Sequence, residues 1–146
     1  MRARALRLTL GLLAGGYAGI GVWAQFAPRS FYDSFPGGGR RWVRVDGPFN
    51  EHLVRDIGGL NLGLAVVAAL AAATLGLALV RAVSLGSIAY YLPHLVYHAS
   101  HLSLYGTADK VGNIGALGLG LALPVIALLL SRAGTPGPVE PARNLR

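Results

Sequence analysis

Three of the four histidines in this chain are close together in the sequence, at His94, His98 and His101. Their spacing of i, i+4 and i+7 places them on one face of an α-helix. The fourth, His52, precedes Asp56 by four residues, so this pair also shares a helix face. Imidazole and carboxylate together form a ligand set for zinc, copper, iron or manganese. Histidines on facing helices can also hold a b-type haem inside a four-helix bundle.

The elements that must position these side chains follow from the distribution of charge. The chain of 146 residues is 53% hydrophobic and only 13% charged, against about 25% charged in soluble domains. Asp, Glu, Lys and Arg are absent from 8–28, 57–80, 82–108 and 111–131, and each stretch exceeds the roughly 18–20 residues that cross a bilayer. These stretches exclude a soluble globular domain and predict an all-α, four-helix transmembrane bundle. We expect a single domain over 1–131, with helices at about 8–26, 51–80, 82–105 and 111–131, and a disordered tail over 132–146.

The first connection, 27–50, is long and rich in aromatic residues, glycine and proline. Pro36 and the run Gly37-Gly38-Gly39 exclude a continuous helix there. One interpretation is an interfacial segment whose rings lie at the level of the lipid headgroups. The other is a cap folded over one end of the bundle. Asn50 is the expected N-cap of the helix that follows.

Small residues are spaced for close helix packing. Gly11, Gly15 and Gly19 recur every four residues in the first helix, and Gly59 and Gly63 do so in the second. Such faces suit a neighbouring helix, a membrane protein partner or a second copy of the chain. The arginines at the start of the chain and the apolar run behind them also fit a secretory signal peptide, but the glycine pattern favours a first helix that stays uncleaved.

The predicted topology brings the polar residues to one end of the bundle. The helix 51–80 begins where the helix 82–105 ends, so all four histidines fall in one leaflet or at its surface. If the face with Gly59 and Gly63 packs on the helix 82–105, the two histidine-bearing faces meet. We therefore expect a polar pocket in the outer leaflet, formed by His52, Asp56, Tyr90, His94, His98, His101, Tyr105, Asp109 and Asn113. Its expected metal ligands are His52, Asp56, His94 and His98.

Three interpretations of this cluster remain open. It can bind a transition metal or haem b, it can be a proton relay or a substrate-binding pocket, or it can be a structural hydrogen-bond cluster, because polar groups in membrane helices face the bundle interior. Neither an HExxH motif nor a Glu-x-x-His pair occurs, which argues against a zinc protease or a diiron-carboxylate site.

For function, the leading expectation is an accessory or binding component of the membrane with no defined reaction, which leans against an enzyme and leaves that question open. The alternative is a membrane oxidoreductase that binds metal or haem through the same residues. A second alternative is a small-molecule carrier. The carrier requires oligomerisation, because four helices enclose little lumen.

The cations indicate lipid as the main partner. The net charge is +7, yet the arginines lie at the ends of apolar segments and are not interleaved with aromatic residues, which excludes nucleic-acid binding. The chain has no cysteine, and therefore no disulfide and no thiolate-ligated metal. The leading arginines favour cytoplasmic termini. The preference for arginine over lysine, with abundant alanine and glycine, indicates a GC-rich bacterial genome and so a multi-pass protein of the bacterial cytoplasmic membrane.

Three sequence blocks carry a resemblance: FYDSFPG at 31–37, DGPFNEHLVRDIGGLNL at 46–62 and PHLVYHASHL at 93–102. In these blocks the chain resembles small four-helix membrane proteins of high-GC bacteria, and in overall build it is similar to the broad DoxX-like group. The resemblance covers about 1–131. It implies an uncleaved four-helix bundle with a polar cap in the first loop, and it implies no established reaction.

Overall fold

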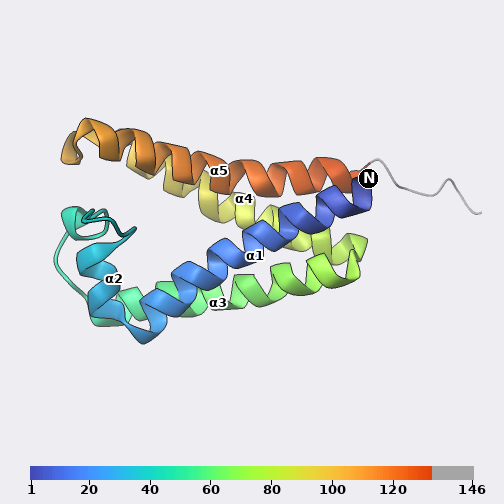
Figure 1. The fold of residues 1–146 in the computed structure, drawn as a ribbon, viewed down its shortest axis with the longest axis horizontal. Helices are drawn as coiled ribbons and strands as arrows, with labels where there is room; N and C mark the ends of the chain where they lie inside the picture. Colours follow the sequence, from blue (N-terminus) through green and yellow to red (C-terminus); the bar gives the residue numbers. More distant parts are fainter. Residues whose placement is uncertain (133–146) are drawn as a thin grey trace, which may run out of the picture.

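The computed structural model describes residues 1–132, and in this part of the chain every regular element is a helix, with no strand (Figure 1). The long helices are α1 (Arg2–Phe26), α3 (Glu51–Thr74), α4 (Leu77–Ser100) and α5 (Thr107–Arg132). Each is long and apolar enough to cross a membrane. The predicted all-α four-helix bundle is therefore confirmed. Beyond Arg132, the predicted disordered tail lies outside the described residues.

The helix ends follow from local chemistry. The side chain of Asn50 accepts a hydrogen bond from the backbone N–H of Leu53 at 3.2 Å, which confirms Asn50 as the N-cap of α3. The predicted helix ends at 80 and 82 are wrong, because the chain turns at Leu75, which adopts a left-handed conformation (φ 54°), and Gly76. Arg81 instead lies in the second turn of α4, where its long side chain can still reach the headgroup level.

The other boundaries differ in the same way. The α-helix α4 ends at Ser100, and a short 3-10 turn, η2 (Leu102–Leu104), leads to Tyr105. Tyr105 was expected to be the last residue of the helix, but it lies outside it. The last helix begins at Thr107 rather than 111. Asp109 consequently lies inside the first turn of α5, with its carboxylate near the positive end of the helix dipole.

The long helices form two pairs, α1 with α3 and α4 with α5. The pairs converge where the N-terminus lies and diverge toward α2 (Figure 1). Arg2 donates from Nε to the carbonyl of Leu130 at 2.8 Å, and Arg7 donates to the carbonyl of Ala72 at 3.3 Å. The start of α1 and the end of α5 therefore lie at the same end of the bundle.

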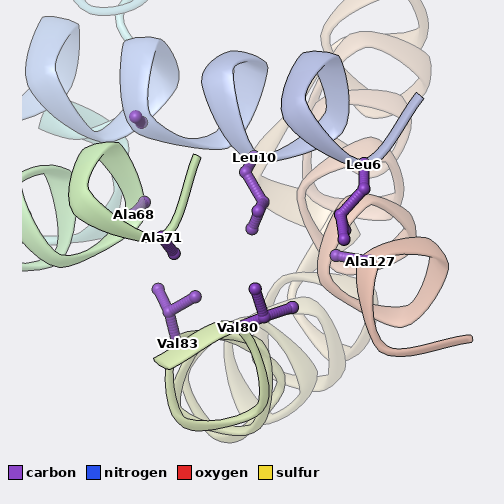
Figure 2. Packing of buried hydrophobic residues seen from close by; sticks show 8 residues of the cluster. Leu6, Leu10, Ala68, Ala71, Val80, Val83 and Ala127 are labelled. Carbon is purple, nitrogen blue, oxygen red and sulfur yellow. The ribbon is translucent and has the colours of Figure 1, made fainter. Parts of the chain in front are cut away.

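Where the pairs converge, small apolar side chains from all four long helices pack together (Figure 2). Leu6 and Leu10 of α1 and Ala127 of α5 are buried in this cluster. The remaining members labelled in Figure 2 are Ala68 and Ala71 of α3 and Val80 and Val83 of α4. Alanine and valine allow close approach of the helices. We call this part of the bundle the closed half.

In α3, close contact with a neighbouring helix is made by a different glycine from the two that the sequence indicated. Gly58 of α3 lies against α1, where a Cβ added to it would be 2.5 Å from the backbone nitrogen of Gln25. A Cβ at Gly63 would meet nothing within 4 Å, so the Gly59–Gly63 face does not carry the contact with α4 that we expected. The stripe of Gly11, Gly15 and Gly19 is likewise open, and its predicted role in oligomerisation stays a prediction.

Residues 27–50 fold as a cap over the end where the pairs diverge. The cap contains the short helix α2 (Pro28–Ser34) and the 3-10 turn η1 (Arg44–Asp46). Between them, Gly37, Gly38 and Gly39 all have positive φ, a conformation that side chains disfavour. Trp42 donates its indole N–H to Asp109 of α5 at 2.9 Å, so the cap is fastened to the opposite helix pair. Of the two interpretations of residues 27–50, the fold therefore agrees with the cap over one end of the bundle.

Candidate functional site

A cavity of about 450 Å³ lies beneath the cap. Every part of the fold except η2 contributes to its wall, because the cap covers the space between the diverging helix pairs. The cap supplies Phe31, Tyr32, Phe35, Trp42, Val43, Asp46, Gly47, Pro48 and Asn50; α1 and α3 supply Ile20, Leu53, Val54 and Ile57; α4 and α5 supply Tyr90, Tyr91, His94, Tyr97, His98, Asn113, Ala116 and Leu117. Aliphatic and aromatic groups dominate this wall, and the few polar groups come mainly from α4.

One end of the cavity wall is a continuous line of hydrogen-bonding side chains. The Nε2 atoms of His94 and His98 are 3.0 Å apart, one helical turn from each other on α4. The other ring nitrogen of His98, Nδ1, lies 3.3 Å from the hydroxyl of Tyr105. That hydroxyl lies 3.1 Å from a carboxylate oxygen of Asp46 in the cap. The line therefore runs from His94 to Asp46, a residue of the cap that lines the cavity and is also exposed at the surface.

Tyr105 is the junction between the cap and α4. Its hydroxyl is also within 3.2 Å of the carbonyl oxygen of Trp42, which can only accept a hydrogen bond. Burial raises the pKa of Tyr105 above its ordinary value, and the negative charge of Asp46 raises it further. The hydroxyl of Tyr105 therefore keeps its proton at neutral pH and can donate it in a hydrogen bond.

Asn113 lines the cavity, but its side-chain oxygen is buried within the wall. The residue is only 3% exposed, and its side-chain oxygen has no hydrogen-bond partner. A buried amide oxygen without a partner costs about 1–3 kcal/mol. The ring of Tyr90 lies edge-on to that of His94, with centroids 5.4 Å apart. Tyr90, His94, His98 and Asn113 of the predicted pocket are thus brought together around one cavity.

His52 and Asp56 are not part of this group. They lie 3.4 Å from one another on the outside of α3, with their side chains 83% and 54% exposed. The reason is the rotation of α3 about its axis, because its close contact is made by Gly58 with α1 rather than by the Gly59–Gly63 face with α4. The prediction that the two histidine-bearing faces pack against each other is therefore wrong.

The expected metal set is consequently not assembled. Within residues 1–132, no three His, Asp or Glu side chains are grouped closely enough to hold a metal ion. His94 and His98 are neighbours on one helix rather than histidines on facing helices, so they do not form the pair that sandwiches a haem. The residues present do not fit either cofactor.

The remaining predicted residues have structural contacts. His101 is exposed at the end of α4, where its ring stacks on Tyr97 with centroids 4.2 Å apart. Asp109 accepts hydrogen bonds from Arg40 and Trp42 and so holds the cap on α5.

Sequence reasoning missed the contribution of Asp46. In the sequence Asp46 follows Arg44 closely, and surface ion pairs are the default expectation for such neighbours, as Asp33 forms with Arg29 and Arg44. Asp46 instead contacts Tyr105, a residue far away in the sequence. No local pattern marks such a contact, since it depends on how the cap folds back.

Comparisons with known proteins add no relative. No family model, curated protein or solved structure matches the chain. The resemblance to small four-helix membrane proteins of the DoxX-like build therefore stays a prediction from three sequence blocks. The cavity and its side chains are the basis for the function proposed below.

Proposed function

We propose that this chain is a binding component of a bacterial cytoplasmic membrane, and that it holds an apolar small molecule with one polar, uncharged group in the capped cavity. The observation that carries the proposal is a cavity of about 450 Å³ whose apolar wall contains a few grouped polar side chains. Small-molecule sites occupy about 300–1,000 Å³ and have this mixture of apolar wall and orienting polar groups. A membrane protein that is only structural gains nothing from leaving this volume unfilled, because packing is its main source of stability.

The route into the cavity supports a ligand dissolved in the membrane. Leu53 and Ile57 of α3 and Tyr97 of α4 line the cavity and are also 43% to 58% exposed. Residues that face both the cavity and the outside border its opening. All three belong to helices long and apolar enough to span a bilayer, so this side of the opening faces lipid, while exposed cap residues such as Asp46 and Asn50 border its other side.

Saturable binding of 2-methoxynaphthalene is the direct test. This probe has an apolar body and an ether oxygen, and equilibrium dialysis against protein in nanodiscs, with empty nanodiscs as blank, separates binding from partition into lipid. Leu117→Trp fills the cavity from α5, and we expect it to weaken binding at least tenfold. Leu119→Trp is the matched control. Leu119 lies two residues after Leu117 on the same helix, but it is 61% exposed and is not part of the cavity wall. Equal binding by both variants, or no saturable binding by the parent, would overturn the proposal.

We further propose that both termini are cytoplasmic. Arg4, Arg7 and Arg81 lie at the closed end, and the described part of the chain has no acidic residue there. At the cap end, cations are paired with acids, as in Arg29–Asp33 and Arg55–Glu51. The anionic cytoplasmic leaflet attracts cations that acidic neighbours do not neutralise, by about 1 kcal/mol each.

Single cysteines test this orientation cleanly, because the chain has none of its own. We expect a membrane-impermeant maleimide to label Arg41→Cys, in the cap, on intact spheroplasts. Arg4→Cys, at the start of α1, should be labelled only after lysis. The reverse pattern would place the cap in the cytoplasm and contradict the proposal.

A further inference from the structure

The line of side chains from Asp46 to His94 has a direction, which its contacts determine. Tyr105 has one hydroxyl proton and three neighbours, namely the carboxylate of Asp46, the carbonyl of Trp42 and Nδ1 of His98. The first two only accept hydrogen bonds, and the ionised carboxylate is the strongest acceptor. The hydroxyl therefore donates to Asp46, and its oxygen is left to accept a hydrogen bond from His98.

The same reasoning assigns the donor and the acceptor in the hydrogen bond between His98 and His94. A neutral imidazole has one N–H and one bare nitrogen. Because Nδ1 of His98 donates to Tyr105, its Nε2 accepts, so the proton between the two rings belongs to Nε2 of His94. The bare nitrogen of His94 is then Nδ1, and within the described residues it has no hydrogen-bond partner. His94 lines the cavity, so the wall presents Nδ1 of His94 as an acceptor without a partner.

We propose that the cavity deprotonates the molecule it holds, which is an apolar compound with a weakly acidic, phenol-type hydroxyl, and that the line His94–His98–Tyr105–Asp46 conducts the proton to the aqueous surface. This inference rests on the proposed function and names its ligand class. An acceptor without a partner selects a ligand that donates a hydrogen bond. A hydroxyl of phenolic acidity can also lose its proton to an imidazole, whereas an ether cannot and an aliphatic alcohol is too weak an acid.

The proton steps balance without any further reagent. The ligand O–H bond breaks, and its proton binds Nδ1 of His94. The Nε2 proton of His94 moves to Nε2 of His98, and the Nδ1 proton of His98 moves to the oxygen of Tyr105. The original hydroxyl proton of Tyr105 binds the carboxylate of Asp46, which releases it to water. Both histidines and Tyr105 end neutral, and the ligand remains as an anion that accepts a hydrogen bond from Nδ1–H of His94.

The groups around this line are consistent with its direction. Asp46 is exposed and lies outside the four helices that can cross a membrane, so it exchanges protons with water. Tyr90 and Tyr97 of α4, and His101 directly after it, also lie beside the line. Asp109 of α5 is a second carboxylate close to Tyr105, but Arg40 and Trp42 already donate to it. Asp46 is therefore the acceptor at the end of the line.

The first experiment compares two probes with the same body. 2-Naphthol has a weakly acidic hydroxyl, and 2-methoxynaphthalene has none to donate. We expect 2-naphthol to bind about tenfold more tightly to the parent protein, the ratio expected for one buried hydrogen bond. The ratio should fall to near one in His94→Phe, which keeps a ring but removes both nitrogens. His52→Phe is the matched control, because the exposed His52 is outside the cavity, and it should leave the ratio unchanged.

The second experiment measures proton transfer from bound 2-naphthol. Its excited state is a strong acid, and the neutral and anionic forms emit at different wavelengths. We expect naphtholate emission from the parent protein and a severalfold smaller naphtholate share in Tyr105→Phe and in Asp46→Asn, which interrupt the line beyond the histidines. Asp56→Asn, which changes an exposed carboxylate of the same type, should match the parent protein.

The outcomes separate the two proposals. If 2-methoxynaphthalene binds but 2-naphthol is not preferred, or if Tyr105→Phe keeps the naphtholate share of the parent, the cavity binds ligands and the proton line is refuted. If neither probe binds saturably, the proposed function fails as well. Agreement between Tyr105→Phe and Asp46→Asn guards against misfolding of a single variant, since the two substitutions alter different elements.

Discussion

The closed half and the capped half of the bundle are built from the same four helices, but they pack differently. In the closed half, alanine and valine side chains bring all four helices into one apolar cluster. In the capped half, tyrosines take their place: Tyr17 of α1 is fully buried and stacks on Tyr91 of α4 with ring centroids 5.7 Å apart. The ring of Tyr91 in turn lies directly against Gly120 of α5.

The size of these side chains accounts for the difference. Tyr17 and Tyr91 belong to different helix pairs, and their stacked rings hold the pairs apart at the level where the cavity begins. Beyond them, side chains of the helices alone do not fill the space, and the cap covers it. The membrane favours neither half, because lipid is equally apolar beside both. Side-chain volume between the pairs thus decides where this bundle closes and where it holds a cavity.

The largest expected effect comes from a substitution that disrupts the contact between α1 and α3. Even in the capped half α1 and α3 are in tight contact, and a methyl group at Gly58 would collide with the backbone of Gln25. We expect Gly58→Ala to destabilise the protein by about 3 kcal/mol, the upper end for overpacking, and to lower its thermal midpoint in detergent. Gly63→Ala, which meets nothing within 4 Å, should leave the midpoint unchanged or raise it slightly. Equal effects of the two substitutions would contradict the observed rotation of α3.

The next largest effect contrasts the two halves directly. Ala68 is fully buried in the closed half, whereas Ala116 lines the cavity and is also exposed at the surface. Ala68→Leu should cost about 2 kcal/mol through overpacking, because three added carbons have no space there. Ala116→Leu should cost less than about 0.5 kcal/mol, since its added carbons extend beside empty volume. Thermal midpoints of both variants measure the contrast, and similar losses would mean that the capped half is as closely packed as the other.

The smallest effect concerns pH at the edge of the capped half. Burial, and then the charge of Asp46, raises the pKa of Tyr105, so the folded protein holds this proton more tightly than the unfolded chain. The stabilisation is complete below the unfolded pKa of about 10 and is lost as pH rises through the folded pKa. Between pH 9 and 12, we therefore expect the thermal midpoint of the parent protein to fall by about 2 °C more than that of Tyr105→Phe. Parallel midpoint curves would show that the hydroxyl of Tyr105 is exposed to water.

Charge and capping chemistry made the fold predictable. Four stretches without charge identified the four long helices, and the side chain of Asn50 identified the start of α3. The turn between α3 and α4 was misplaced, because we took Arg81 to mark a helix end. The chain turns earlier, at Leu75 and Gly76, and neither a leucine in a left-handed conformation nor a single glycine is a strong signal in an apolar run.

The candidate site was predictable along one helix but not between helices. The i, i+4 spacing of His94 and His98 predicted their shared face, and their rings do interact. The same spacing holds for His52 and Asp56, which point away from the cavity. Periodicity fixes which residues share a face, whereas the neighbour of that face depends on the packing of several helices. Asp46 illustrates the same limit, since only the folded cap brings it to Tyr105.

The convergence of the helix pairs at one end also has a mechanical consequence. The closed half acts as a fulcrum, and the rest of each pair is a lever. A helix of 24 residues, such as α3 or α4, is about 36 Å long, so a rotation of about 3° at the fulcrum displaces its far end by about 2 Å. Such a small tilt widens or narrows the opening between α3 and α4 by about the radius of a methyl group and changes the packing at the fulcrum little. The cap is continuous with α1 and α3 and is hydrogen-bonded to Asp109 of α5, so it limits how far the two helix pairs can separate.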